Sequence, residues 1–292
     1  MPAIAEKIPM QKISDPEIEL FGVDLFMLRL DLIHPNINGN KWFKLRYNLD
    51  EAKHQNKGTL LTFGGAFSNH IAATSAAGKE FGFKTIGIIR GEELNESSNP
   101  TLEFARKNGM KLYFVTRGNY RKKNSQEFIS ELKNLFGDFY MLPEGGTNEL
   151  AVKGCSEIIS NVDIPFDFIC CAVGTGGTIA GIISSIEKNQ KVIGFPVLKD
   201  TEFIENTVKK FVGGKKNWTL NYDYHFGGYA KTSSELLKFA DRFKKQTDII
   251  LDPVYTGKLM FGIYNLIKRK SLKKGAKIIA LHTGGILNTT LT

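Results

Sequence analysis

The chain has 292 residues, of which 42% are apolar and 24% charged, and it carries a net charge of +9 at pH 7. These values are typical of a globular protein with a large core in one or two domains, and they exclude a disordered or fibrous protein. The first residues lack the apolar stretch of a signal peptide, and no apolar run is long enough to cross a membrane. We therefore expect a soluble cytoplasmic protein.

The charge and the cysteines exclude other classes of site. The basic clusters, such as 121–123 and 268–270, are not interleaved with aromatic residues, which favours a solvated surface over a nucleic-acid site. The positive charge would still attract anionic substrates. Cys170 and Cys171 are adjacent on a strand pattern and should point to opposite faces, so we expect neither a disulfide framework nor a metal site. The five histidines also lack the spacing of metal ligands.

Strands and helices are predicted to alternate along the first half of the chain, as in a parallel α/β unit. The expected order is an extended pair at 19–31 broken at Gly22, a helix ending near Gly58, a strand at 59–63, a helix at 69–81, a strand at 85–90, a helix at 100–108, a strand at 111–115 and a helix at 125–136.

A second α/β series is predicted after the loop at 143–148. Its elements are a helix at 150–159, a strand at 166–173, a helix at 179–186, a strand at 192–197, helices near 202–211 and 233–245, a strand at 248–251, a helix at 258–268 and a strand at 276–281. The simplest packing of the two series is two α/β lobes with a cleft between them.

Three of the predicted strands end in turns of small residues, at 64–70, 174–178 and 282–285. Such turns at the ends of buried strands direct backbone N–H groups and hydroxyls into one crevice. This arrangement suits a phosphate-bearing cofactor and a carboxylate substrate.

The turn at 174–178, Gly-Thr-Gly-Gly-Thr, is the most specific of the three. Its glycines allow an anion to approach the backbone closely, and its threonines add hydroxyl donors. The lysine of a nucleotide-binding phosphate loop and the spacing of a dinucleotide fingerprint are both absent, which favours a monophosphate such as that of pyridoxal phosphate. The alternative is a glycine-rich turn that only lets a helix pack on a strand.

Pyridoxal phosphate also requires a lysine that forms a Schiff base. Lys41 lies just ahead of the first long helix, beside small polar residues and Trp42. Desolvation there would lower the pKa of its amine and make it an imine former and proton carrier. The alternative is an ordinary surface lysine.

The chain resembles the 1-aminocyclopropane-1-carboxylate deaminase and D-cysteine desulfhydrase family over nearly its whole length. The segments that carry the resemblance occur in the family's order: 38–41 with Lys44, 65–70, 174–178, 252–258 and 282–285. The resemblance implies a fold-type II pyridoxal-phosphate enzyme, similar to the tryptophan synthase β-subunit, with two open, twisted, mostly parallel sheets flanked by helices. It also implies a large cofactor domain at 1–43 and 149–292, a small domain at 44–148, and a homodimer.

The resemblance also implies roles for single residues. Lys41 matches the lysine that binds the cofactor and carries the α-proton, Asn69 the residue beside the cofactor 3′-oxygen, and Ser68 the hydroxyl near the substrate carboxylate. The implied phosphate site is Lys44, Gly174, Thr175, Gly176, Gly177 and Thr178, and the implied carboxylate site is Ala66, Phe67, Ser68, Asn69 and His70.

Three further positions bear on the reaction. Tyr255 matches an aromatic residue close to cofactor and substrate, and Tyr229 matches a second active-site tyrosine, although either can instead be a core residue. Thr256 matches the residue that faces the pyridine nitrogen and occurs, as here, in the desulfhydrase branch, where the deaminase branch has glutamate. A threonine would leave that nitrogen largely neutral, and this weaker electron sink suits β-elimination.

The expected reaction is therefore α,β-elimination of D-cysteine to pyruvate, hydrogen sulfide and ammonia, and the alternative is 1-aminocyclopropane-1-carboxylate deamination to 2-oxobutyrate and ammonia. Phe67 and Phe43 replace a glutamine and an arginine that are common in the family, which leaves the substrate preference open. Two other readings remain: a non-catalytic ligand-binding protein, and a nucleotide-dependent reductase, for which the required acidic ribose partner is not found.

Overall fold

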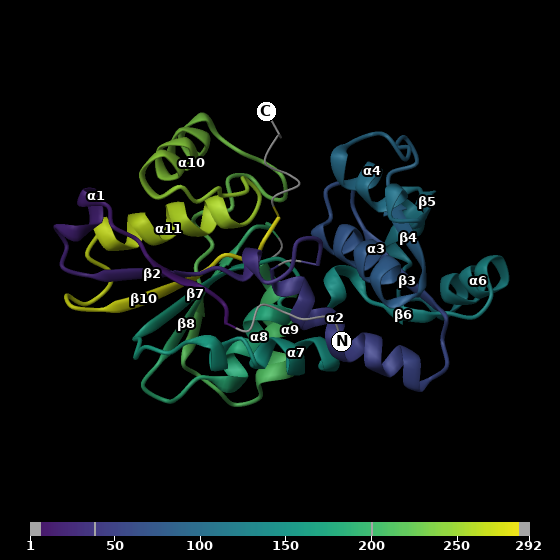
Figure 1. Cartoon of the computed structure of the whole chain (residues 1–292), viewed down its shortest axis with the longest axis horizontal. Coiled ribbons are helices and arrows are strands. Elements are labelled where there is room, and N and C mark those ends of the chain that lie inside the picture. The colour runs from purple at the N-terminus through teal and green to yellow at the C-terminus, as the bar shows by residue number, and fades with distance from the viewer. Residues whose placement is uncertain (1–6, 38, 200, 286–292) are drawn as a thin grey trace.

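Two sheets, each covered by helices on both faces, form the two lobes of the computed structural model (Figure 1). The structure describes residues 7–37, 39–199 and 201–285. Asn38, the first residue of the lysine segment, lies outside the described residues. Within the described part, no helix is both long and apolar enough to cross a membrane.

The larger sheet has six strands in the order β1-β2-β10-β7-β8-β9, and all neighbours are parallel except the pair β1 and β2. The strands are β1 (Met10–Lys12), β2 (Asp24–Leu28), β7 (Phe168–Val173), β8 (Lys191–Pro196), β9 (Trp218–Leu220) and β10 (Lys277–Leu281).

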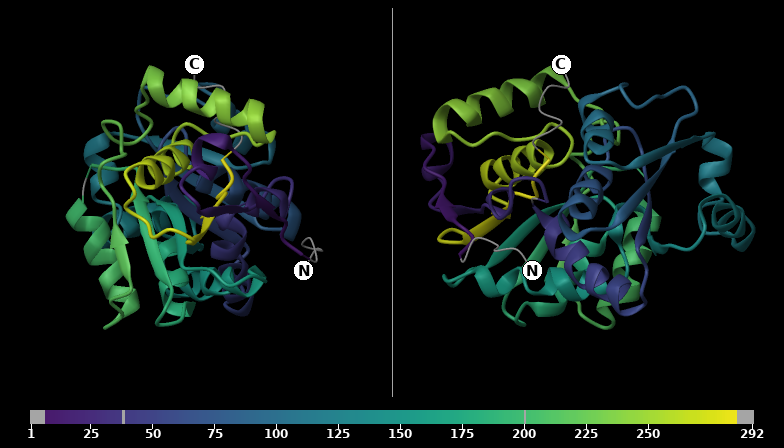
Figure 2. Two further views of the ribbon diagram at one scale, coloured as in Figure 1. Left: turned by 90° about the vertical axis from the view of Figure 1, so that its left-hand side faces the viewer. Right: turned by 45° about the vertical axis from the view of Figure 1, so that its right-hand side comes forward.

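Helices enclose this sheet from both sides (Figure 2). One face packs on α7 (Glu149–Ser156), α8 (Gly177–Ser185) and α9 (Thr201–Val212), and the other on α1 (Pro16–Glu19), α10 (Ser234–Thr247) and α11 (Thr256–Lys268). Cys171 belongs to the first core and Cys170 to the second, as the period of a strand predicts. Both side chains are buried free thiols.

The smaller sheet has four parallel strands in the order β5-β4-β3-β6. Its elements are β3 (Thr59–Gly64), β4 (Lys84–Arg90), β5 (Lys111–Val115), β6 (Tyr140–Leu142), α3 (Asn69–Phe81), α4 (Pro100–Lys107), α5 (Arg117–Arg121) and α6 (Gln126–Phe136). α5 and α6 pack on one face, and α3 and α4 on the other.

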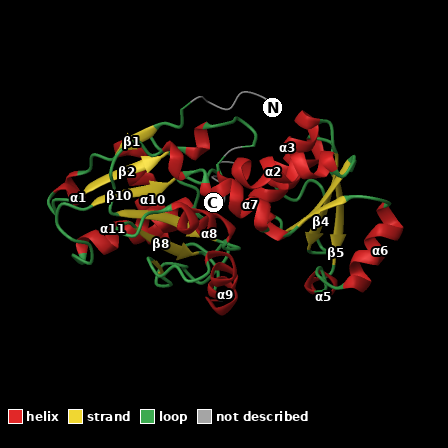
Figure 3. Ribbon diagram, turned by 90° about the horizontal axis from the view of Figure 1, so that it is seen from below, coloured by secondary structure: helices red, strands yellow, loops and turns green. Residues whose placement is uncertain are grey.

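Helix α2 (Asn40–His54) lies with α7 between the two sheets (Figure 3). Short 3-10 turns η1 (Leu30–Leu32), η2 (Glu144–Gly146) and η3 (Ile159–Asn161) complete the connections. The architecture confirms the predicted fold class of two mostly parallel sheets flanked by helices. The four strands of the smaller sheet lie inside the range 44–148 that the sequence suggests for a small domain.

Two of the predicted elements were wrong. The extended pair at 19–31 contains only β2, because Asp15 caps a helix at Pro16–Glu19 by accepting the N–H of Glu17 at 2.9 Å. The predicted strand at 248–251 is not a strand. The carbonyl of Ile250 accepts a hydrogen bond from the His282 ring at 2.8 Å, and β10 already has β2 and β7 as neighbours.

Candidate active site

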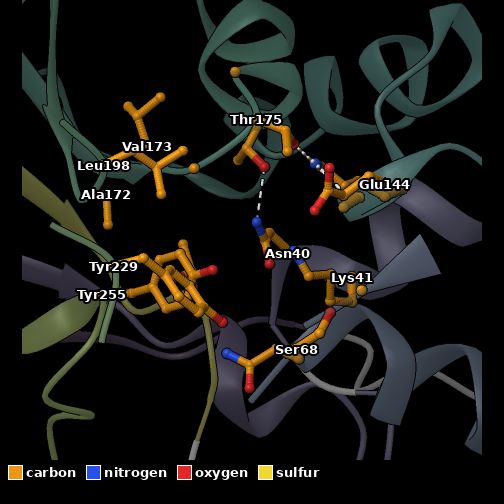
Figure 4. Close-up of a pocket in the computed structure, with 18 of the residues that line it drawn as sticks. Asn40, Lys41, Ser68, Glu144, Ala172, Val173, Thr175, Leu198, Tyr229 and Tyr255 are labelled. Atoms are coloured by element: carbon orange, nitrogen blue, oxygen red, sulfur yellow. Dashed lines mark hydrogen bonds between the residues drawn. The ribbon is translucent and has the colours of Figure 1, made fainter. Parts of the chain in front are cut away.

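A cavity of about 260 Å³ lies where the predicted small-residue turns meet, between the two lobes. Gly64 and Gly65 reach it from the end of β3, Gly174 from the end of β7, and Thr283 from the end of β10. The prediction that these turns share one crevice is confirmed. In Figure 4, Lys41 and Ser68 lie across this cavity from Tyr229 and Tyr255.

Lys41 is the second residue of α2 and lines the cavity. Desolvation, and after it the positive charge of Lys44, lower the pKa of the Lys41 amine from 10.5 to about 7. The neighbouring Trp42 side chain is buried in the hydrophobic core. A lysine amine that is half neutral near pH 7 is prepared for nucleophilic attack and for proton transfer.

We predict that Lys41 of the cofactor-free protein reacts with an amine-directed acylating reagent half-maximally near pH 7, because only the neutral amine reacts. Lys12 is the internal control, since its ion pair with Asp24 raises the pKa of its amine above 10.5. Peptide mass spectrometry of samples labelled between pH 5 and 10 measures both sites. A Lys41 profile that coincides with that of Lys12 would contradict the assignment.

The same shift has a consequence for stability. Between about pH 7 and 10.5, the unfolded chain holds the Lys41 proton and the folded chain has released it. The free energy of unfolding of the cofactor-free protein therefore rises with pH across this window through this group.

Lys44 lies one turn further along α2, and its side chain is buried. Its amine donates to the carbonyl of Gly145 at 2.8 Å and to the hydroxyls of Thr147 at 3.0 Å and Thr175 at 3.5 Å. Burial lowers the pKa of this amine to about 8. Within the described ranges, no carboxylate lies within ion-pair distance of Lys44, so the cation lacks a partner charge.

This unpaired cation lies beside the N-terminus of α8. Gly176 adopts a left-handed conformation with φ of 86°, so the chain turns from β7 into α8, whose first turn lines the cavity with Thr178 and Ile179. Thr175 and Thr178 add hydroxyls, and the amide of Asn40 donates to Thr178 at 2.7 Å. A buried ammonium, a helix N-terminus and two hydroxyls fit a phosphate. Gly177 lies behind this wall, where a side chain would meet Thr147.

The residues of the turn at 65–70 line two different cavities. Ser68 and Asn69 line the active-site cavity, and the Ser68 hydroxyl caps α3 by accepting the N–H of Ile71 at 3.3 Å. Ala66 and Phe67 line a second cavity next to the first.

His70 does not line the active-site cavity, in contrast to Ser68 and Asn69. It is 1% exposed and lies against Gly146, and neither ring nitrogen has a hydrogen-bond partner among the residues that the structure describes. Desolvation, together with the charges of Lys41 and Lys44, lowers the pKa of His70 well below 6.5. The ring is therefore neutral and cannot act as an acid at neutral pH.

Tyr229 and Tyr255 both line the cavity, and their rings meet edge to face at 6.2 Å. The Tyr229 hydroxyl donates to the carbonyl of Phe67 at 3.1 Å and shares a hydrogen bond with the Tyr255 hydroxyl. Burial raises the pKa of Tyr229 to about 12 and that of Tyr255 well above its ordinary value. Both residues therefore present protonated hydroxyls.

Thr256 is fully buried and does not line the cavity. Its hydroxyl donates to the Asp252 carboxylate at 2.6 Å and accepts the N–H of Asp252 at 2.8 Å. The same carboxylate accepts the N–H groups of Tyr255 at 2.7 Å and Thr256 at 2.9 Å, which fixes the backbone just before and at the start of α11. The hydroxyl proton of Thr256 is thus committed to Asp252.

Two charged residues of the site were absent from the predicted set. Arg90 ends β4 and Glu144 follows β6, so both lie at the carboxyl edge of the smaller sheet, next to the end of β3. This edge is where parallel sheets bind ligands. Arg90 ends a strand that was predicted correctly, but its place beside the end of β3 depends on the strand order.

Comparison with known proteins places this geometry among enzymes. The family model described as "Pyridoxal-phosphate dependent enzyme" matches residues 5–284. A Pyrococcus furiosus protein with the name "Putative 1-aminocyclopropane-1-carboxylate deaminase" is 32% identical, over 93% of this chain and 87% of that protein. The mitochondrial bifunctional D-cysteine desulfhydrase/1-aminocyclopropane-1-carboxylate deaminase of Arabidopsis thaliana is 30% identical, over 91% of this chain and 73% of that protein.

A solved structure gives the same result. The crystal structure of an ACC deaminase homologue superimposes with a TM-score of 0.85 at 30% sequence identity. The match covers 99% of this chain and 92% of that one.

Proposed function

The chain belongs to the family of pyridoxal-phosphate-dependent enzymes, and from this premise we propose that it is a lyase that deaminates a small amino acid by α,β-elimination. The observation that carries the proposal is the pair of lysines on α2. Lys41 has an amine with its pKa lowered to about 7, and Lys44 is a buried cation at the proposed phosphate site that pairs with no carboxylate of the described residues. Pyridoxal phosphate, when bound, supplies an electron-withdrawing ring that stabilises negative charge at the substrate Cα.

Each part of the site has a proposed role. Lys44, Thr175 and Thr178 hold the phosphate. The Lys41 amine takes the α-proton of the substrate, which its lowered pKa permits near neutrality. Ser68 and Asn69, at the N-terminus of α3, bind the substrate carboxylate, because anions are stabilised there.

The tyrosine pair lies on the opposite side of the cavity from Lys41 (Figure 4). Two protonated hydroxyls suit the donation of a proton to the departing β-substituent. Thr256 acts as a positioning residue, because its bond to Asp252 holds the carboxylate that accepts the N–H of Tyr255.

We propose D-cysteine as the substrate, supported by the Tyr-Thr-Gly sequence at 255–257 that resembles the desulfhydrase branch. The second candidate is 1-aminocyclopropane-1-carboxylate, which is favoured by the names of similar proteins. The cytoplasmic location and the homodimer also stay predictions. Light scattering coupled to size-exclusion chromatography measures the molar mass of the protein and tests the homodimer.

Incubation of the purified holoenzyme with D-cysteine, L-cysteine and 1-aminocyclopropane-1-carboxylate tests this assignment. We expect pyruvate and sulfide in equal amounts from D-cysteine, because one Cβ–S bond breaks for each molecule deaminated. Release of 2-oxobutyrate as the main product would select the second candidate instead. Absence of any oxo acid from all three compounds would contradict the proposed lyase.

A further inference from the structure

A second cavity of about 520 Å³ opens beside the active-site cavity. The two share Gly65, Arg90, Glu144 and Tyr229 as wall residues. The second cavity therefore lies directly beside the active-site cavity, and it is large enough for an extended substituent of the substrate.

The wall of the second cavity has an excess of positive charge. Of its two carboxylates, Glu93 pairs with Arg117, while Glu144 accepts the Tyr120 hydroxyl at 2.8 Å and lies 3.3 Å from Lys123. The cavity wall also contains Arg90 and Arg121. In the part of the chain that the structure describes, neither arginine has a carboxylate within ion-pair distance.

Arg90 is the cationic residue that lines both cavities. It ends β4, directly beside the end of β3, and its guanidinium lies 5.6 Å from the centre of the Tyr120 ring. A methyl group at Gly65 would lie 3.4 Å from one of its terminal nitrogens, so the guanidinium lies next to the turn at 65–70. A planar guanidinium in this position can bind a carboxylate or a similar acid through two hydrogen bonds.

We propose that the second cavity receives an acidic group at the far end of the substrate's β-substituent, and that Arg90 is the residue that recognises it. The inference rests on the proposed elimination and names its substrate class: amino acids whose β-substituent carries a second acid. For a thioether of this class, the Cα–H bond breaks and its proton passes to Lys41. The Cβ–S bond then breaks, its electron pair leaves with sulfur, and the tyrosine pair donates the proton that converts the thiolate to a thiol. Water hydrolyses the resulting enamine to pyruvate and ammonia.

A matched pair of substrates tests the recognition. S-(carboxymethyl)cysteine and S-(carbamoylmethyl)cysteine, each in both configurations, differ only by an acid in place of an amide. The electron-withdrawing amide makes the better leaving thiolate, so a preference for the acid cannot come from leaving ability. We expect the holoenzyme to have a kcat/KM about tenfold higher for the acid, as for one charge-assisted hydrogen bond.

In Arg90→Gln we expect this preference to disappear through a higher KM for the acid, with the amide little affected, and in Arg90→Lys we expect part of it to remain. Arg106→Gln is the control, because it removes one arginine from α4 whose ion pair with Glu96 is 4.0 Å long. Equal losses for acid and amide in Arg90→Gln would place Arg90 on the α-carboxylate and overturn the proposal. An unchanged acid preference in Arg90→Gln would overturn it as well.

Equilibrium binding separates this proposal from the proposed function. Glutamate and glutamine form an acid and amide pair without a leaving group, and titration calorimetry with the holoenzyme measures their affinities without turnover. Tighter binding of glutamate that depends on Arg90 supports the acid site even if no substrate is eliminated. Equal affinity of the two ligands overturns the acid site even if D-cysteine is turned over.

Discussion

Lys41→Arg is expected to lower the rate of oxo-acid formation by about 10⁴-fold or more. The substitution keeps a long cationic side chain at the start of α2, but a guanidinium cannot lose its proton in a protein and cannot form an imine. It removes both proposed roles of Lys41, covalent attachment of the cofactor and transfer of the α-proton. Steady-state assays with the best substrate of the panel measure the loss.

Borohydride reduction of the holoenzyme, followed by peptide mass spectrometry, should place the cofactor adduct on Lys41. Two other lysines are credible competitors, because Lys44 and Lys258 also have pKa values lowered to about 8. The Lys258 amine already donates to the carbonyls of His225 at 2.9 Å and Gly228 at 2.8 Å, and it is not among the residues that line the cavity. For the activity assay of Lys41→Arg, the control variant is Lys57→Arg, at an exposed ion pair with Asp138, which should retain full activity. An adduct on Lys44 or Lys258 would contradict the mechanism.

The long elements of this fold could be predicted from the sequence, and the short or context-dependent ones could not. Helices α3, α8 and α11 and strands β3, β4 and β7 have apolar periodicity over enough residues to be recognised. Strands β1, β6 and β9 have three residues each, which is too few for a period to emerge. The segment at 248–251 has the composition of a strand, but tertiary contacts decide its structure. The His282 ring donates a hydrogen bond to the carbonyl of Ile250, which a strand would use for pairing.

The same division holds for the site. The glycine-rich turns and Lys41 carry local signals, and the structure brings them together at one cavity. Arg90 enters the site only because β4 lies beside β3, and the order of strands in a sheet is not written in any local pattern. The orientation of Thr256 depends on Asp252, which competes for its hydroxyl proton. Asp252 lies six residues ahead of the helix predicted at 258–268, so no local capping pattern indicated this hydrogen bond.

Helix α7 sets the distance between the reactive lysine and the phosphate wall. It lies between α2, which carries Lys41 and Lys44, and α8, whose N-terminus forms that wall. The contacts of α7 with α2 and with α8 each depend on a glycine. A methyl group at Gly154 of α7 would lie 1.9 Å from the carbonyl oxygen of Phe43, and one at Gly181 of α8 would lie 2.5 Å from the Cβ of Cys155. The backbone of α7 at Gly154 therefore packs directly on the backbone of α2, and the backbone of α8 at Gly181 packs directly on Cys155 of α7. Larger residues at these two positions would hold the helices further apart.

Gly154→Ala is accordingly expected to lower the free energy of unfolding by about 3 kcal/mol, because a methyl group cannot fit against the Phe43 carbonyl unless α2 moves. Since Phe43 lies between the two lysines, the same movement should weaken cofactor binding by about tenfold. Denaturant unfolding and cofactor titration measure the two effects. Gly58→Ala is the matched control: a methyl group there meets no heavy atom of the described residues within 4 Å, so its free energy of unfolding should change by no more than about 0.5 kcal/mol. Equal stability of the two variants would show that the separation of α2 and α7 is not set by this glycine.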